Sequence, residues 1–185
     1  MKKFASLSLA ALLVTALSVS ASAASTSSAA QGTATIDGKK DDIYVCDPLI
    51  VNVVANNDGN LASPASGKVW TAWDADNLYV YAEVTDSAVT KAENVTTAWS
   101  NDCVEVYINL SGEEGSISDI NAAQVTYGPG FESIQGGGLY RENNIDKIKF
   151  NYTYTDYGYT VELALPFADF GAKVGATLGF SIGIN

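Results

Sequence analysis

Three residues near the middle of the chain, Trp99, Glu105 and Tyr107, carry side chains that suit the recognition of a sugar. Glu105 and Tyr107 stand two positions apart in the alternating run VEVYIN, so a strand would place both on one face of a sheet. A carboxylate accepts hydrogen bonds from sugar hydroxyls, and an aromatic ring packs against the apolar face of a pyranose. The sequence contains no histidine, so acid–base catalysis would need a carboxyl or lysine of shifted pKa. The pattern favours holding a sugar over cleaving one.

Each of these residues also has a plainer interpretation. Trp99 lies in a polar stretch, 94–102, outside the alternating pattern, and is either a stacking platform or a core residue. One stacked indole would contribute only about 1–2 kcal/mol after ordering costs, which predicts weak binding. Glu105 and Glu162 have the residue types of a glycosidase pair, but nothing in the sequence brings them together, so binding or structural hydrogen bonding is favoured.

Two aspartates, Asp86 and Asp102, flank the loop that carries Trp99. A calcium ion held by these carboxylates would fix the loop and orient the indole, because hard oxygen ligands suit that ion. The alternative is that both aspartates cap local backbone in turns. A second acidic cluster at 37–42 has the same two interpretations.

The elements that must position these residues are strands, because the dominant hydrophobic period is two. Turn residues at 74–77 and 156–158 separate paired alternating stretches and predict hairpins. Two glycine-rich polar segments, 111–119 and 128–144, read as long loops. The predicted fold is all-β, an antiparallel, jelly-roll-like β-sandwich. Its predicted strands lie at 68–73, 78–85, 103–110, 148–154, 159–165 and 178–184.

Other aromatic residues of the first hairpin fit packing better than binding. Trp73 shares a strand face with Val69 and is predicted to be a core residue. Trp70 points to the opposite face, where packing and glycan contact both remain open. Tyr79 and Tyr81 lie together on one face of the next strand, and structural packing is favoured for both.

The ends of the chain carry their own signals. Residues 1–23 have two lysines, an apolar run and a small-residue cleavage site, which together predict a secretory signal peptide and a protein exported from the cell. No later segment has the roughly 20 apolar residues of a spanning helix. Residues 24–32 read as a small, polar tether, and residues 33–185 as one domain. Because the last strand pattern runs to Asn185 with no cap or turn, the domain is expected to continue beyond it.

Charge and cysteine content limit the partners. Beyond the signal sequence there are eight basic and 21 acidic residues, a formal charge of −13. Such a surface repels phosphate backbones, which argues against nucleic acid, and it offers carboxylates to calcium. Cys46 and Cys103 are free to pair in an oxidising compartment, but a domain of this size does not depend on a disulfide, and their pairing stays open.

A series of short motifs occurs in a fixed order along the chain. They are IDG at 36–38 with DDIY at 41–44, WD at 73–74 with NLYV at 77–80, VTD at 84–86, NDCVEVYI at 101–108, YTVE at 159–162 with Pro166, and GFSIGIN at 179–185. In this order they resemble the pattern of carbohydrate-binding module family 9, and the resemblance covers residues 36–185. It implies a β-sandwich with bound calcium and a site that grips sugar, in some members the reducing end of xylan or cellulose chains. It also implies attachment to secreted plant-wall hydrolases or surface proteins.

Individual site residues follow from the same resemblance. Trp99 matches a tryptophan that forms one wall of an aromatic sandwich around the sugar, Glu105 a carboxylate that bonds sugar hydroxyls, and Gln124 a glutamine that begins the next strand. The partner tryptophan lies in a C-terminal stretch of the family that this sequence does not include. Thr126 and Gly128 stand where the family has arginine and asparagine.

Two rival functions remain open. Similar sandwiches carry haem through methionine and histidine or lysine ligands; here histidine is absent and the only methionine, Met1, lies in the signal sequence. The domain would otherwise be a structural spacer of a surface protein. An absorption spectrum tests the first rival, and titration with glycans tests the second.

Overall fold

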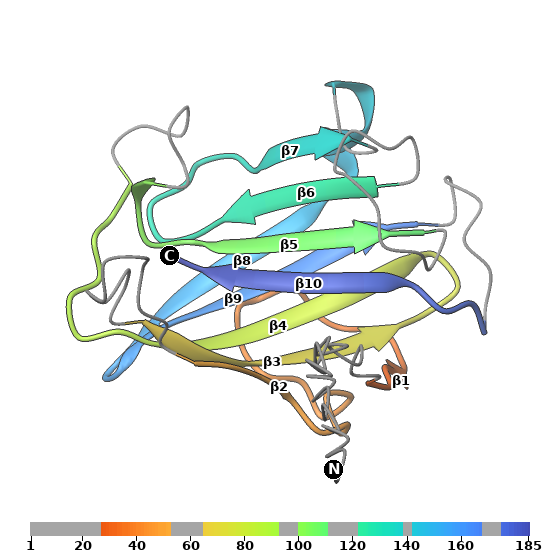
Figure 1. The fold of residues 1–185 in the computed structure, drawn as a ribbon, viewed down its shortest axis with the longest axis horizontal. Helices are drawn as coiled ribbons and strands as arrows, with labels where there is room; N and C mark the ends of the chain where they lie inside the picture. The colour runs from red at the N-terminus through yellow and green to blue at the C-terminus, as the bar shows by residue number, and fades with distance from the viewer. Residues whose placement is uncertain (1–26, 53–64, 93–99, 111–121, 139–141, 168–174) are drawn as a thin grey trace, which may run out of the picture.

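A computed structural model of the chain describes residues 27–52, 65–92, 100–110, 122–138, 142–167 and 175–185. Within these ranges almost all regular structure is strand, and the strands form two sheets that lie one over the other (Figure 1). The expected β-sandwich is therefore confirmed.

The larger sheet is built around the two predicted hairpins. Its strand order is β1-β3-β4-β9-β8, and β2 pairs with β3 beside β1. The β1–β3 pair is parallel and covers two residues of each strand, whereas the other pairs are antiparallel. Its strands are β1 (Ala30–Gln31), β2 (Leu49–Val51), β3 (Ser66–Trp73), β4 (Asn77–Thr85), β8 (Lys149–Thr155) and β9 (Gly158–Pro166).

The smaller sheet has the order β10-β5-β6-β7, and all of its pairs are antiparallel. Because β10 pairs with β5, the end of the described chain lies beside the start of β5 (Figure 1). Its strands are β5 (Val104–Asn109), β6 (Ala122–Tyr127), β7 (Gln135–Gly138) and β10 (Gly179–Ile184).

The core lies between the sheets and follows the period of two. Val80, Ala82 and Val84 on β4 face Val104 and Val106 on β5, and all five are buried. Their neighbours along each strand point outward, so each sheet presents a second face away from the core. These outer faces carry the polar and aromatic residues that the sequence singles out.

A second, smaller apolar layer covers the outer face of the larger sheet. Trp70, Tyr79 and Tyr81 are buried there, and Tyr44 stacks on Tyr81 with ring centroids 5.3 Å apart. The Lys40 ammonium lies 3.5 Å from the centroid of the Trp70 ring, a cation–π contact. Trp70, Tyr79 and Tyr81 are thus packing residues, as favoured for the tyrosines.

Trp73 packs against the main core and its indole N–H donates to the Ala29 carbonyl at 3.1 Å, which confirms its structural role. The segment predicted as a loop at 128–144 contains the strand β7 and the start of a 3-10 helix, η2 (Glu142–Lys147). Three of the four β7 residues are glycine, so no hydrophobic alternation marks that strand. Cys46 and Cys103 are both free thiols.

Candidate functional site

Four polar side chains gather on the outer face of the smaller sheet: Glu105 and Tyr107 on β5, Gln124 on β6, and Asn185 just after β10. Strand register brings the first three together, because Tyr107 lies directly opposite Gln124 and its neighbour Glu105 is on the same face. Asn185 reaches them because its backbone N–H donates to the Cys103 carbonyl at 3.0 Å. We call these four residues the Glu105 cluster.

Hydrogen bonds join every member of the cluster. The Gln124 amide donates to Glu105 Oε1 at 2.9 Å and to the Tyr107 hydroxyl at 3.2 Å. The Tyr107 hydroxyl donates to Glu105 Oε2 at 3.2 Å, and Asn185 Nδ2 donates to the same oxygen at 3.2 Å. The Glu105 carboxylate is therefore held in place by three donors from three different positions in the sheet.

This arrangement decides what the cluster can recognise. The two N–H groups of Gln124 are taken by Glu105 and Tyr107, and Asn185 Nδ2 donates to Glu105 and to Cys103 Sγ at 3.6 Å. What remains for a ligand is the carbonyl oxygen of each amide and the remaining lone pairs of the carboxylate. The cluster thus presents acceptors, which suit the hydroxyl donors of a sugar.

The burial of Tyr107 and the nearby Glu105 carboxylate raise the pKa of the Tyr107 phenol, so it stays protonated as a donor.

Glycines on the two neighbouring strands leave open space beside the cluster. A side chain started at Gly183, opposite Glu105, would lie 3.7 Å from Glu105 Oε2, and one at Gly137, opposite Gln124, would meet nothing within 4 Å. The two neighbouring strands therefore leave the half-exposed cluster uncovered.

The predicted site residues Glu105 and Gln124 thus lie together, whereas Trp99 lies outside the described residues. The sequence already indicated Tyr107 beside Glu105, although the family resemblance assigned it no role, and Asn185 was not predicted at all. Tyr107 was visible as a partner through its two-residue spacing from Glu105, but Asn185 is 80 positions away and joins only through the β10–β5 register.

The two departures from the family pattern have different surroundings. Thr126 is buried on β6. At Gly128, any added Cβ would collide with the carbonyl oxygen of Asp102 and lie 2.8 Å from the Cys103 Cα. Because both obstacles are backbone atoms, a side chain at position 128 would require the start of β5 to move.

The predicted calcium ligands, Asp86 and Asp102, are also brought together. Asp86 is buried and accepts from the Ala88 N–H at 2.8 Å, and Asp102 accepts from the Thr90 N–H. Burial raises the pKa of the Asp102 carboxyl, and the neighbouring Asp86 raises it further. Two adjoining carboxyls are suitable ligands for a divalent cation. Both also accept hydrogen bonds from backbone N–H groups of turns, as expected if they cap local backbone.

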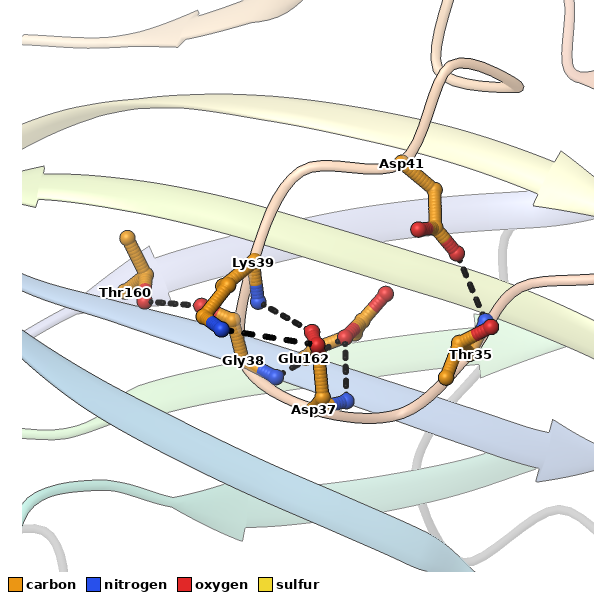
Figure 2. A network of polar contacts seen from close by, with 7 residues as sticks. All are labelled: Thr35, Asp37, Gly38, Lys39, Asp41, Thr160 and Glu162. Atoms are coloured by element: carbon orange, nitrogen blue, oxygen red, sulfur yellow. Dashed lines mark hydrogen bonds and ion pairs between the residues drawn. The ribbon is translucent and has the colours of Figure 1, made fainter.

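Glu162 lies on the opposite outer face of the sandwich from Glu105, so the two cannot act as a catalytic pair on one bond. It is fully buried, and its Oε2 accepts from the backbone N–H groups of Asp37 and Gly38 at 3.0 Å each (Figure 2). Its Oε1 accepts from the Tyr44 hydroxyl at 2.9 Å. Burial raises the pKa of Glu162, while these three hydrogen bonds oppose that rise.

The acidic residues at 37–42 also stabilise the N-terminal segment that contacts Glu162. Asp37 accepts from the Lys39 N–H at 2.9 Å, and Asp41 from the Thr35 N–H at 2.6 Å (Figure 2). Gly38 has a φ of +79°, and a Cβ there would lie 2.8 Å from Thr153 Oγ1, so glycine is required. The motif at 36–38 is thus a clasp that attaches the N-terminal segment to the larger sheet. In the described parts of the chain no three acidic or cysteine side chains are grouped for a metal.

A family profile described as "Carbohydrate family 9 binding domain-like" matches residues 36–185 of this chain. The chain is 31% identical over 156 residues to an exoglucanase, XynX, of Acetivibrio thermocellus and 30% identical over 155 residues to endo-1,4-beta-xylanase A of Thermoanaerobacterium saccharolyticum. Each match covers 83% of this chain but only 13% and 12% of the relatives' lengths.

The fold is similar to solved structures of a carbohydrate binding module family 9 from Caldicellulosiruptor kristjanssonii, in complexes with cellotriose and with glucose. The TM-score is 0.68 for both, at 20% identity. The likeness covers 85% of this chain and 74% and 76% of the respective chains. Across the described ranges no helix is long and apolar enough to cross a membrane.

Proposed function

Because the chain belongs to the carbohydrate family 9 binding domain-like family, we propose that it binds carbohydrate without catalysing a reaction, and that the Glu105 cluster makes the polar contacts. The observation that carries the proposal is the fixed Glu105 carboxylate, which three side-chain donors hold on an open sheet face. The related enzymes are xylanases and an exoglucanase, which supports xylan or cellulose as the ligand class.

Binding would depend on preorganised acceptors. Glu105, Gln124 and Asn185 are already oriented by hydrogen bonds to each other, so little side-chain freedom is lost when a sugar hydroxyl donates to them. Trp99, which the family resemblance predicts to be a site residue, would supply an apolar platform for the pyranose ring. Each ring packed on an indole removes apolar area from water at roughly 25 cal/mol per Å².

The test is isothermal titration of the protein with cellotriose and with xylotriose. We expect Glu105→Gln to weaken binding at least about tenfold, since hydrogen bonds to a charged group are worth roughly 1.5–3 kcal/mol. Trp99→Ala should weaken it about three- to tenfold and leave the unfolding curve unchanged. Glu132→Gln, which removes an exposed carboxylate elsewhere, is the matched control. Equal affinities for Glu105→Gln and Glu132→Gln would remove the Glu105 cluster from the site.

We further propose that Asp86 and Asp102 hold a calcium ion that stabilises the segment between them. The support is the contact between their carboxyls, whose charges a divalent cation would neutralise. Calcium should raise the midpoint of thermal unfolding by several degrees, and a chelator should reverse it. Asp102→Asn should abolish that response. A calcium response that persists in Asp102→Asn would place the ion elsewhere.

The cellular setting belongs to the same proposal. We propose that residues 1–23 direct export, and that the domain holds an attached hydrolase or a cell surface near its polysaccharide. The chain spans only 12–14% of the length of its curated relatives, in which the catalytic activity is a property of the whole proteins.

A further inference from the structure

A second aromatic surface lies at the turn between β8 and β9, away from the Glu105 cluster. Tyr154 and Tyr157 are 52% and 48% exposed and belong to the small group of described large apolar or aromatic residues that face solvent. Both border a shallow pocket of about 550 Å³ that is largely open to solvent. The turn lies at the end of the sandwich where β5 begins (Figure 1).

The pocket is built from rigid parts. The strands pair up to Thr155 and Gly158, so only Asp156 and Tyr157 form the turn. The Asp86 N–H donates to the Tyr157 carbonyl at 2.9 Å, which fixes the turn against the segment that follows β4. A Cβ at Gly158 would collide with the Val84 carbonyl, so this close approach requires glycine.

The ring of Tyr154 is also held in position by packing against other aromatic rings. Its ring meets the Tyr152 ring edge-on with centroids 5.6 Å apart, and Tyr152 lies 6.1 Å from the Tyr127 ring, which is buried in the core. A side chain anchored by this aromatic series, yet half open to solvent, loses little freedom when a ligand packs on it.

The chemistry of the lining selects the ligand. Beside the two tyrosines the pocket is bordered by Ser87, Asp156 and Asp86, and among the residues that the structure describes no lysine or arginine lines it. Asp86 is directed to the Ala88 N–H and to Asp102, which leaves Asp156, Ser87 and the phenol hydroxyls for a ligand. Flat aromatic surface with hydroxyl groups suits a hydroxyl-rich ring, whereas the Asp156 carboxylate would repel an anionic ring.

We propose that this pocket, which we call the Tyr157 pocket, is a second carbohydrate subsite that binds one neutral pyranose and rejects uronic acids. The ligand class rests on the proposed function, but the location does not. A polysaccharide chain that contacts both this pocket and the Glu105 cluster would be held by two weak sites. Its affinity would therefore exceed that of a sugar bound at either site alone.

The experiment is a titration of ¹⁵N-labelled protein with cellotriose, read at each backbone amide, and repeated with glucuronic acid. We expect the amides at 86–88 and 156–158 to shift with cellotriose along a binding curve of their own, and not with glucuronic acid. Tyr157→Ala should weaken that curve roughly five- to tenfold and leave the shifts around Glu105 unchanged. Ile50→Ala, which removes an exposed apolar side chain on β2, should change neither.

The outcomes separate the two proposals. Shifts around Glu105 without shifts at 86–88 and 156–158 would overturn the second subsite and leave the proposed function standing. Shifts only at the Tyr157 pocket would instead contradict the proposed role of the Glu105 cluster in sugar binding. Equal shifts with glucuronic acid, or a cellotriose curve unaltered in Tyr157→Ala, would also overturn the subsite.

Discussion

Tyr107 connects two other members of the Glu105 cluster through hydrogen bonds. Its hydroxyl accepts from Gln124 and donates to Glu105, so it links the amide on β6 to the carboxylate on β5. Tyr107→Phe keeps the ring but removes both bonds, and it frees one N–H of Gln124 to turn toward the ligand. We expect glycan affinity to fall about three- to tenfold, since a hydrogen bond contributes about 0.5–1.5 kcal/mol.

The measurement for Tyr107→Phe is calorimetric titration with cellotriose beside a urea unfolding curve. An unchanged unfolding midpoint with weakened binding supports the positioning role. Affinity equal to that of the parent protein would mean that Glu105 is held well enough by Gln124 and Asn185 alone.

Glu162 gives a residue-scale prediction about stability rather than binding. Glu162→Ala leaves two backbone N–H groups and the Tyr44 hydroxyl without their acceptor in a buried place, and should cost about 3–5 kcal/mol of unfolding free energy. Glu162→Gln retains an oxygen for the backbone donors and removes the buried charge, so its cost should stay near 1 kcal/mol. Chemical unfolding of the two variants checks the contrast; similar costs for both would mean that the charge itself stabilises the clasp.

At the scale of elements, the β3–β4 hairpin carries a pH-dependent prediction. Although partial desolvation opposes it, hydrogen bonds from Tyr79, Asp76, Asn77 and Thr33 lower the pKa of Asp74 to about 2, from 3.8. A folded pKa below the unfolded one adds stability that is complete above pH 3.8 and is lost as the pH falls through 2.

Asp74→Asn should therefore reduce the unfolding free energy by about 1 kcal/mol at pH 6 and by much less at pH 2. Unfolding curves of the parent and variant across this range provide the measurement. A difference that stays constant with pH would show that the carboxylate charge does not stabilise the turn.

The same hairpin shows what the sequence makes predictable. The hydrophobic alternation and the turn residues at 74–77 predict β3, β4 and their register. Both signals depend only on residues that are close together in the sequence. The strand β7 could not be predicted, since glycines carry no hydrophobic pattern. At the site, Glu105 and Tyr107 are recognisable from spacing within one strand, whereas Asn185 enters only through pairing between distant strands. The clasp at Glu162 depends on a connection of 124 positions, which no local pattern encodes.

The protein as a whole has a formal charge of −11. This charge predicts different binding of neutral and acidic glycans. Both surfaces proposed to bind sugar contain a carboxylate, and the described residues that line the Tyr157 pocket include no basic one. Attraction to a neutral chain then rests on packing and hydrogen bonds, which salt screens little, whereas repulsion of a polyanion is long-ranged and is screened over about 10 Å at 0.1 M salt.

We therefore expect retention by xylo- and cello-oligosaccharides to change less than about twofold between 0.05 and 0.5 M sodium chloride. Polygalacturonate should not retain the protein at the lower concentration, and any retention should appear only as salt rises. Affinity electrophoresis in gels containing each polysaccharide measures this directly, with an uncharged carrier protein as the mobility control. In the presence of a chelator that removes calcium, retention by polygalacturonate that is strongest at low salt would contradict the acceptor-rich character of both surfaces, because it would require a cationic site in the protein itself.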